Sequence, residues 1–213
     1  MRSLRKILYR TITLVLLMTG PAACFFFGNC PDVLPYFSIQ GLRMSNLVYT
    51  GQTTAQRPYK WRAVEDNEPV YWNNYFVRTY FESIFHAQYE NSNGYGLYAL
   101  DCNSNGERGS KVGVDTMYLV TLQDYNSQYL QNDTLNNIML INDELLNIQD
   151  FKNFTDLSKY TQNNSDVIRK GYFDFKLTEP PLNSNDEYRF KLIFILKSGE
   201  EFEKISEPVR LTK

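Results

Sequence analysis

The strongest constraint on the fold is an alternation of apolar residues near the C-terminus. Large apolar side chains occupy every second position there, at Tyr188, Phe190, Leu192, Phe194 and Leu196. Because alternate residues of a β-strand point to the same face, this pattern predicts a strand with one buried face. Residues 197–200 predict a tight turn, after which residues 202–211 return as the partner strand. Pro208 has no N–H to donate, so it predicts a sheet edge or a change of sheet within that partner strand.

Shorter alternations between Asn- and Gly-rich turns predict strands along much of the remaining chain. These predicted strands cover residues 36–40, 44–49, 75–82, 95–100, 114–123 and 173–177. Only residues 134–148 show helical spacing, with Asp133 as the candidate N-cap. Residues 51–69 have no period, which indicates a functional loop or an unrecognised strand. The predicted fold is all-β, an immunoglobulin-like two-sheet β-sandwich with one or two short helical insertions, and a barrel is the alternative.

The first 23 residues have the organisation of a secretory signal peptide. Four basic side chains stand at its start, Arg2, Arg5, Lys6 and Arg10. An apolar run at 11–19 and small residues at 20–23 follow them. The apolar run is about half of the ~20 residues that a membrane-spanning helix needs. We therefore expect a signal peptide at 1–23, an N-terminal segment at 24–35 and a single β-sandwich domain at 36–213.

Cys24 follows Ala22 and Ala23 directly, and this arrangement resembles the lipobox of bacterial lipoproteins. The resemblance implies that the Cys24 thiol is diacylated and becomes the new N-terminus, and two acyl chains give stable membrane attachment. Pro21 departs from the aliphatic residue usual in that motif, so ordinary cleavage that leaves a thiol at Cys24 is the alternative. The predicted location is the cell envelope, lipid-anchored in the outer membrane, on its periplasmic or surface-facing leaflet.

The remaining cysteines form an even pair. With Cys24 used by the anchor, Cys30 and Cys102 are left in an oxidising compartment, which predicts a disulfide between them. Such a bridge would close a loop of about 70 residues and stabilise the fold by roughly 4 kcal/mol in the chain-entropy model. The alternative is two separate buried thiols.

Two segments carry candidate binding residues. Trp61, Tyr71, Trp72 and Tyr75 offer aromatic surface to a glycan or a protein partner, or alternatively fill the core. We expect Trp72 to be core and Trp61 to be the more exposed indole.

The second segment resembles half of a calcium-binding loop. Asp101, Asn103 and Asn105 alternate before Gly106, as oxygen ligands do in such loops. Val112 stands where the loop needs a bidentate Glu, so a polar turn is the alternative. We predict no cofactor.

Several function classes are excluded. The formal net charge of −2 and scattered basic side chains leave no footprint for nucleic acid. His86 is the only histidine, which excludes His-rich zinc sites, and we expect it to be structural. The chain lacks nucleophile-elbow, zincin and Walker motifs. Two hypotheses remain: a non-enzymatic envelope module that binds an unknown envelope protein or glycan, and a carbohydrate-active enzyme using paired carboxylates.

A family resemblance covers nearly the whole chain after the signal. Its parts are Cys24 with Cys30 six residues later, the segments 36–42 and 114–125, and the hairpin segment 190–199. Together these are similar to Bacteroidales lipoproteins of about 200 residues, a family of unknown function. The resemblance implies an envelope lipoprotein and carries over no catalytic residue.

Overall fold

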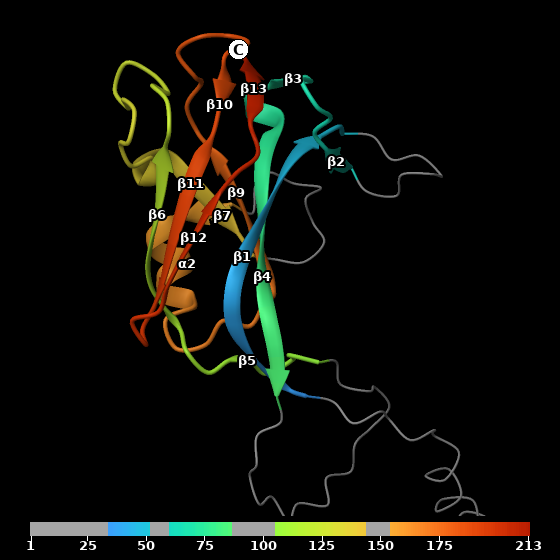
Figure 1. The fold of residues 1–213 in the computed structure, drawn as a ribbon, viewed down its shortest axis with the longest axis vertical. Helices are drawn as coiled ribbons and strands as arrows, with labels where there is room; N and C mark the ends of the chain where they lie inside the picture. The colour runs from blue at the N-terminus through green and yellow to red at the C-terminus, as the bar shows by residue number, and fades with distance from the viewer. Residues whose placement is uncertain (1–33, 52–59, 87–104, 144–153) are drawn as a thin grey trace, which may run out of the picture. The chain divides into compact units, whose positions relative to one another are not determined.

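The computed structural model describes residues 34–51, 60–86, 105–143 and 154–213 (Figure 1). The strands are β1 Tyr36–Tyr49, β2 Trp61–Ala63, β3 Pro69–Tyr71, β4 Tyr75–His86, β5 Gly109–Ser110, β6 Val114–Thr121, β7 Met139–Asn142, β8 Thr155–Asp156, β9 Tyr172–Leu177, β10 Glu187–Tyr188, β11 Phe190–Leu196, β12 Glu201–Ile205 and β13 Val209–Thr212. The helical elements are the 3-10 turns η1 Trp72–Asn74 and η2 Asn136–Ile138 and the helix α2 Leu157–Asn163. No helix within these ranges has the length and apolarity to cross a bilayer.

The strands form three sheets. The largest has the order β2-β1-β4-β9-β7-β8, with β5 parallel to the start of β1. A second sheet has the order β12-β11-β6, and a short third sheet has the order β10-β13-β3. All pairs are antiparallel except β1 with β5 and β13 with β3. The predicted all-β sandwich is confirmed.

The core lies between the inner faces of the two larger sheets. Phe81 of β4 and Phe173 of β9 contact Phe194 of β11, with ring centroids 5.2 and 6.0 Å apart. Tyr160 of α2 packs on Phe173 at 5.3 Å. Offset and tilted aromatic pairs of this kind stabilise a core beyond the area they bury. Thr79 points into the same layer, fully buried, and its hydroxyl has no hydrogen-bond partner in the described part of the chain.

The C-terminal hairpin agrees with the sequence pattern. All the inward residues of β11 are buried, and β12 returns antiparallel to it. The turn is closed by the Leu196 N–H donating to the Glu200 carbonyl at 2.9 Å, with Gly199 at φ +87°. After Ser206 the chain passes Pro208 and enters the third sheet as β13. The proline therefore marks a change of sheet, one of the two outcomes its chemistry allowed.

The predicted strands 36–40 and 44–49 are one continuous strand. β1 pairs with β4 along almost its whole length, and its register shifts between Ile39 and Gly41. A bulge moves the inward positions by one residue, which keeps both Ile39 and Leu42 in the core. The break in alternation came from this bulge and not from a turn.

The helix predicted at 134–148 is wrong for its described part. η2 occupies Asn136–Ile138, and β7 begins at Met139. The spacing correctly predicted which apolar side chains are buried, namely Leu135, Ile138 and Met139. They are buried by a turn followed by a strand and not by a helix. The helix that does form, α2, was not predicted, since Tyr160 is its only buried residue and gives no apolar spacing. The predicted strand 95–100 lies outside the described residues.

Candidate binding groove

The four candidate platform aromatics do not form one surface. Tyr75 is buried, and its hydroxyl donates to Asn46 Oδ1 at 2.8 Å, so its ring is unavailable to a ligand. Tyr71 is 47% exposed and lies 6.3 Å from the half-buried Trp72, which packs against the main core. Trp61 is also half-buried, but it packs on a separate small cluster on the outer face of the large sheet. The structure thus brings together only Tyr71 and Trp72. Both indoles are half-buried, so the expectation that Trp61 is the more exposed of the two is not confirmed.

Trp61 covers a buried ion pair on that outer face. Arg78 of β4 donates through Nε and Nη2 to both carboxylate oxygens of Asp174 on β9, at 2.7 and 2.8 Å. The guanidinium lies between two rings, 4.5 Å from the centroid of Trp61 and 4.6 Å from that of Tyr172. Burial lowers the pKa of Arg78, but the hydrogen bonds and charge of Asp174 outweigh it and the pKa is raised. Burial raises the pKa of Asp174, and Arg78 offsets only part of that rise. The pair fixes the β4–β9 register.

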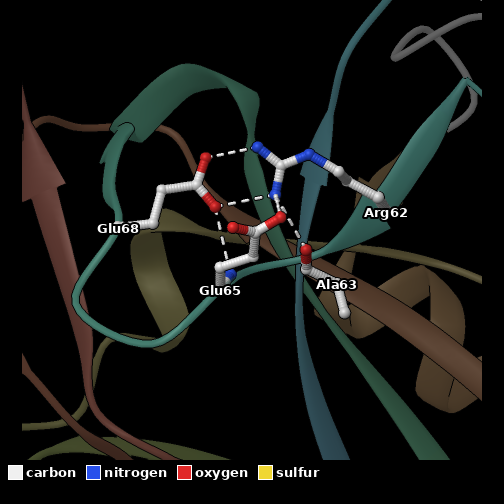
Figure 2. Close-up of polar contacts among 4 residues, drawn as sticks. All are labelled: Arg62, Ala63, Glu65 and Glu68. Atoms are coloured by element: carbon white, nitrogen blue, oxygen red, sulfur yellow. Dashed lines mark hydrogen bonds and ion pairs between the residues drawn. The ribbon is translucent and has the colours of Figure 1, made fainter.

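The predicted aperiodic segment 51–69 contains β2 and an ion-paired turn in its described part (Figure 2). Arg62 donates to both carboxylate oxygens of Glu68, one bond being Nη1 to Oε2 at 2.7 Å. Glu68 also accepts the Glu65 N–H at 3.0 Å. The Arg62 hydrogen bond is the largest cause that lowers the pKa of Glu68, to about 2. Asn67, at φ +61°, lets the chain turn back toward β3. These side chains bond to one another and so stabilise the turn.

Most of the other predicted site residues lie outside the part of the chain that the structure describes. Cys24, Cys30, Cys102, Asp101 and Asn103 lie outside the described residues, so the predicted anchor and disulfide stay predictions.

Asn105, a predicted calcium ligand, and His86, a predicted structural histidine, lie within the described residues. Asn105 Oδ1 accepts the Leu34 N–H at 2.9 Å, so this oxygen already serves the backbone. No group of three metal-ligating side chains occurs among the described residues. His86 ends β4, and its ring stacks on Tyr36 at 6.4 Å.

A groove with a mixed polar and apolar lining lies where β6, η2 and α2 meet. Its volume is about 700 Å³. Val114, Met139 and Leu157 contribute apolar surface, and the rest of the lining is polar. The polar lining consists of Asp115, Thr116, Asn136, Asn137, Asp156, Ser158, Thr161, Gln162, Ser165 and Lys197. Amide, hydroxyl and carboxylate groups on several elements can together bind a ligand that carries many hydroxyl groups.

Backbone contacts hold the walls of this groove together. Gly113 packs so closely on the end of α2 that a Cβ there would lie 1.9 Å from the Ser165 carbonyl oxygen. The Val114 N–H donates to the Asn164 carbonyl at 2.8 Å, and the Lys197 N–H donates to the Gly113 carbonyl at 3.0 Å. Tyr160 anchors α2 in the core. The groove is therefore built on rigid elements.

The polar side chains of the groove divide into two groups. Asn136 bridges to β6, accepting the Leu119 N–H and donating to the Met117 carbonyl at 2.9 and 3.0 Å, so its amide is structural. Thr161 donates to the Leu157 carbonyl within α2. Asp115, Asn137 and Gln162 are exposed, and they make no side-chain hydrogen bond within the described ranges. These three side chains are free to contact a ligand.

Sequence reasoning did not find this groove. Its residues come from four separated stretches, and none of them forms a chemical motif. The only available signal was the surplus of Asn, Asp, Ser and Thr around 134–137 and 156–165, which also occurs in ordinary turns.

Comparison with known proteins adds no relative: no family model, no curated protein and no solved structure matches the chain.

Proposed function

We propose that this chain is a lipid-anchored envelope lipoprotein whose β-sandwich is a non-enzymatic binding module, with an oligosaccharide as its ligand. The groove of about 700 Å³ between β6, η2 and α2 carries this proposal. Its free side chains offer amide donors and acceptors with a carboxylate, which match sugar hydroxyl groups. The volume lies within the range of small-ligand sites. The signal peptide and Cys24 support the envelope location.

The test is a glycan array probed with the purified protein and with a double variant, Asn137→Ala with Gln162→Ala. Both side chains are exposed and unbonded, so the melting temperature should stay unchanged while glycan binding falls to background. Asn73→Ala with Gln131→Ala removes one exposed amide of each kind outside the groove and is the matched control. Undiminished glycan binding by the groove variant would reject the groove as the site. If the wild type binds no glycan but captures one envelope protein that the groove variant does not capture, the ligand is a protein and not an oligosaccharide.

A second candidate function rests on two carboxylates in the same groove. Asp115 extends from β6, and Asp156 precedes α2 without capping it through its side chain. Glycosidases of most families use two carboxylates across a cleft, one of them as the acid. Release of reducing sugar by the wild type, abolished by both Asp115→Asn and Asp156→Asn, would favour the enzyme over the binding module.

A further inference from the structure

One tip of the large sheet combines apolar and cationic side chains. This N-terminal tip consists of residues 34–37, 84–86 and 105–111, where β1 begins, β4 ends and β5 pairs beside them (Figure 1). Ile84 is 58% exposed and Phe85 is 41% exposed. Successive residues of a strand point to opposite faces, so the tip is apolar on both faces of the sheet. Each face of the tip therefore presents one exposed apolar side chain, Ile84 on one face and Phe85 on the other.

Cations surround an aromatic ring at the same tip. The Tyr36 ring lies 4.7 Å from Lys111 Nζ and 5.8 Å from the Arg108 guanidinium carbon. Arg108 also donates to the Tyr36 hydroxyl at 3.3 Å. Glu107 is the single carboxylate in the stretch 105–111, so that stretch has a net positive charge. Aromatic rings, aliphatic side chains and cations together are typical of surfaces that lie at a lipid headgroup layer.

The length of chain before the tip places it near the predicted anchor. Cys24 stands ten residues before Leu34, which allows at most about 35 Å of extended chain. The opposite end of β4 is about 40 Å farther along the strand. A lipid at Cys24 would hold the N-terminal tip at high effective concentration above the bilayer. Under that condition a weak surface contact is occupied for a measurable fraction of the time.

We propose that the N-terminal tip docks on an anionic phospholipid bilayer. Ile84 and Phe85 enter the boundary between headgroups and acyl chains, and Lys111 contacts lipid phosphates. This inference rests on the anchor in the proposed function and adds an orientation to it, because docking leaves the third sheet and the end of β12 facing away from the membrane. The occupant is the bilayer surface, and no protein partner is required at this tip.

The experiment uses the full lipidated protein in vesicles of phosphatidylethanolamine with phosphatidylglycerol. A photo-crosslinking residue, benzoyl-phenylalanine, replaces Ile84 in one sample and Ile205 or Leu182 in the controls. These two controls are 49% and 45% exposed, compared with 58% for Ile84. Ile205 pairs with Lys191 next to Phe190, whose ring lies 6.3 Å from Tyr75 at the opposite end of β4. We expect lipid adducts by mass spectrometry at position 84 and not at the control positions.

The charge contribution is tested in the same assay. Lys111→Glu should lower the adduct yield at position 84 about fivefold or more, the factor that one cation near an anionic surface supplies. Lys204→Glu changes an exposed charge on β12 and should leave the yield unchanged. Vesicles of phosphatidylcholine alone should give a low yield with either protein.

The outcomes separate the two proposals. Protein that fails to float with the vesicles would disprove the anchor. Protein that floats but gives equal adducts at 84 and at the controls would overturn the docking alone. Adducts from position 84 to residues 24–33 or 87–104 of the chain itself, in place of lipid, would also overturn it, because the chain would then cover its own tip.

Discussion

Removing one partner of the Arg78–Asp174 pair should be among the most destabilising single changes in the described domain. The Arg78 and Asp174 side chains are only 9% and 1% exposed, and they share two hydrogen bonds. Asp174→Asn would leave a buried guanidinium without a counter-ion, which costs about 3–5 kcal/mol. The two flanking rings, Trp61 and Tyr172, keep part of the cation's stabilisation and place the cost toward the lower end of that range.

The magnitude translates into a large thermal shift. A domain of 150–250 residues loses about 2–4 °C of melting temperature per kcal/mol, so Asp174→Asn should lower it by roughly 6–20 °C. Replacing both partners, as Arg78→Met with Asp174→Leu, removes both desolvation costs and should stay within about 2 kcal/mol of wild type. Urea denaturation followed by circular dichroism measures all three proteins. A loss of less than about 1 kcal/mol in the unfolding free energy of Asp174→Asn would refute the argument that Arg78 needs Asp174 as its buried counter-ion.

The same pair predicts a pH dependence. In Arg78→Met the carboxyl of Asp174 keeps the burial that raises its pKa and loses the donors that lower it. Asp174 of the folded variant then binds a proton more tightly than it does in the unfolded chain, so the contribution of this group to stability is largest in acid and is lost as the pH rises through the raised pKa. The penalty of Arg78→Met relative to wild type should therefore be smaller at pH 4 than at pH 7. An equal penalty at both values would contradict this account.

Three further predictions concern single sites. Thr79→Val removes a buried hydroxyl without a partner at nearly constant volume, and should raise the free energy of unfolding by about 1 kcal/mol in urea titrations. The lowered pKa of Glu68 means that its bond to Arg62 stabilises the fold above about pH 4.5 and that this stabilisation is lost as the pH falls toward 2. The loss is about 1–2 kcal/mol of unfolding free energy after allowance for partial exposure. In Glu68→Gln this part of the acid destabilisation should be absent from urea titrations at low pH. Gly113→Ala should cost at least about 2–3 kcal/mol and weaken groove binding, because its Cβ would overlap the Ser165 carbonyl; unchanged melting and binding would show that the backbone shifts freely there.

The strands that alternate cleanly were predictable, and the reason is burial on one face. β11 and β9 show buried apolar residues at alternate positions, and Pro208 marked the change of sheet correctly because its chemistry is local. The helix prediction was wrong at residues 134–142, because i, i+3, i+4 spacing of apolar residues also arises when a 3-10 turn leads into a strand. Burial there depends on neighbours distant in sequence, which periodicity does not contain.

The groove and the ion pair were hidden from sequence for a related reason. Arg78 and Asp174 are 96 residues apart, and neither lies in a motif. Their relation is created by strand order, and the groove likewise needs β6, η2 and α2 to meet. Trp61 was identified as a binding candidate from its chemistry alone. Its ring is instead engaged by Arg78, an interaction that only the register of the large sheet reveals.

The strand order also bears on how the chain folds. Asn46 on β1 donates its amide to the Glu207 carbonyl, 161 residues away, and β3 pairs in parallel with β13. Contacts of such long sequence separation form slowly, because loop closure must precede the stabilisation they bring. The sheet that contains β3 has no partner for that strand until β13 has been synthesised. The third sheet can therefore form only when nearly the whole chain is available, a delay that suits the export we propose for this protein.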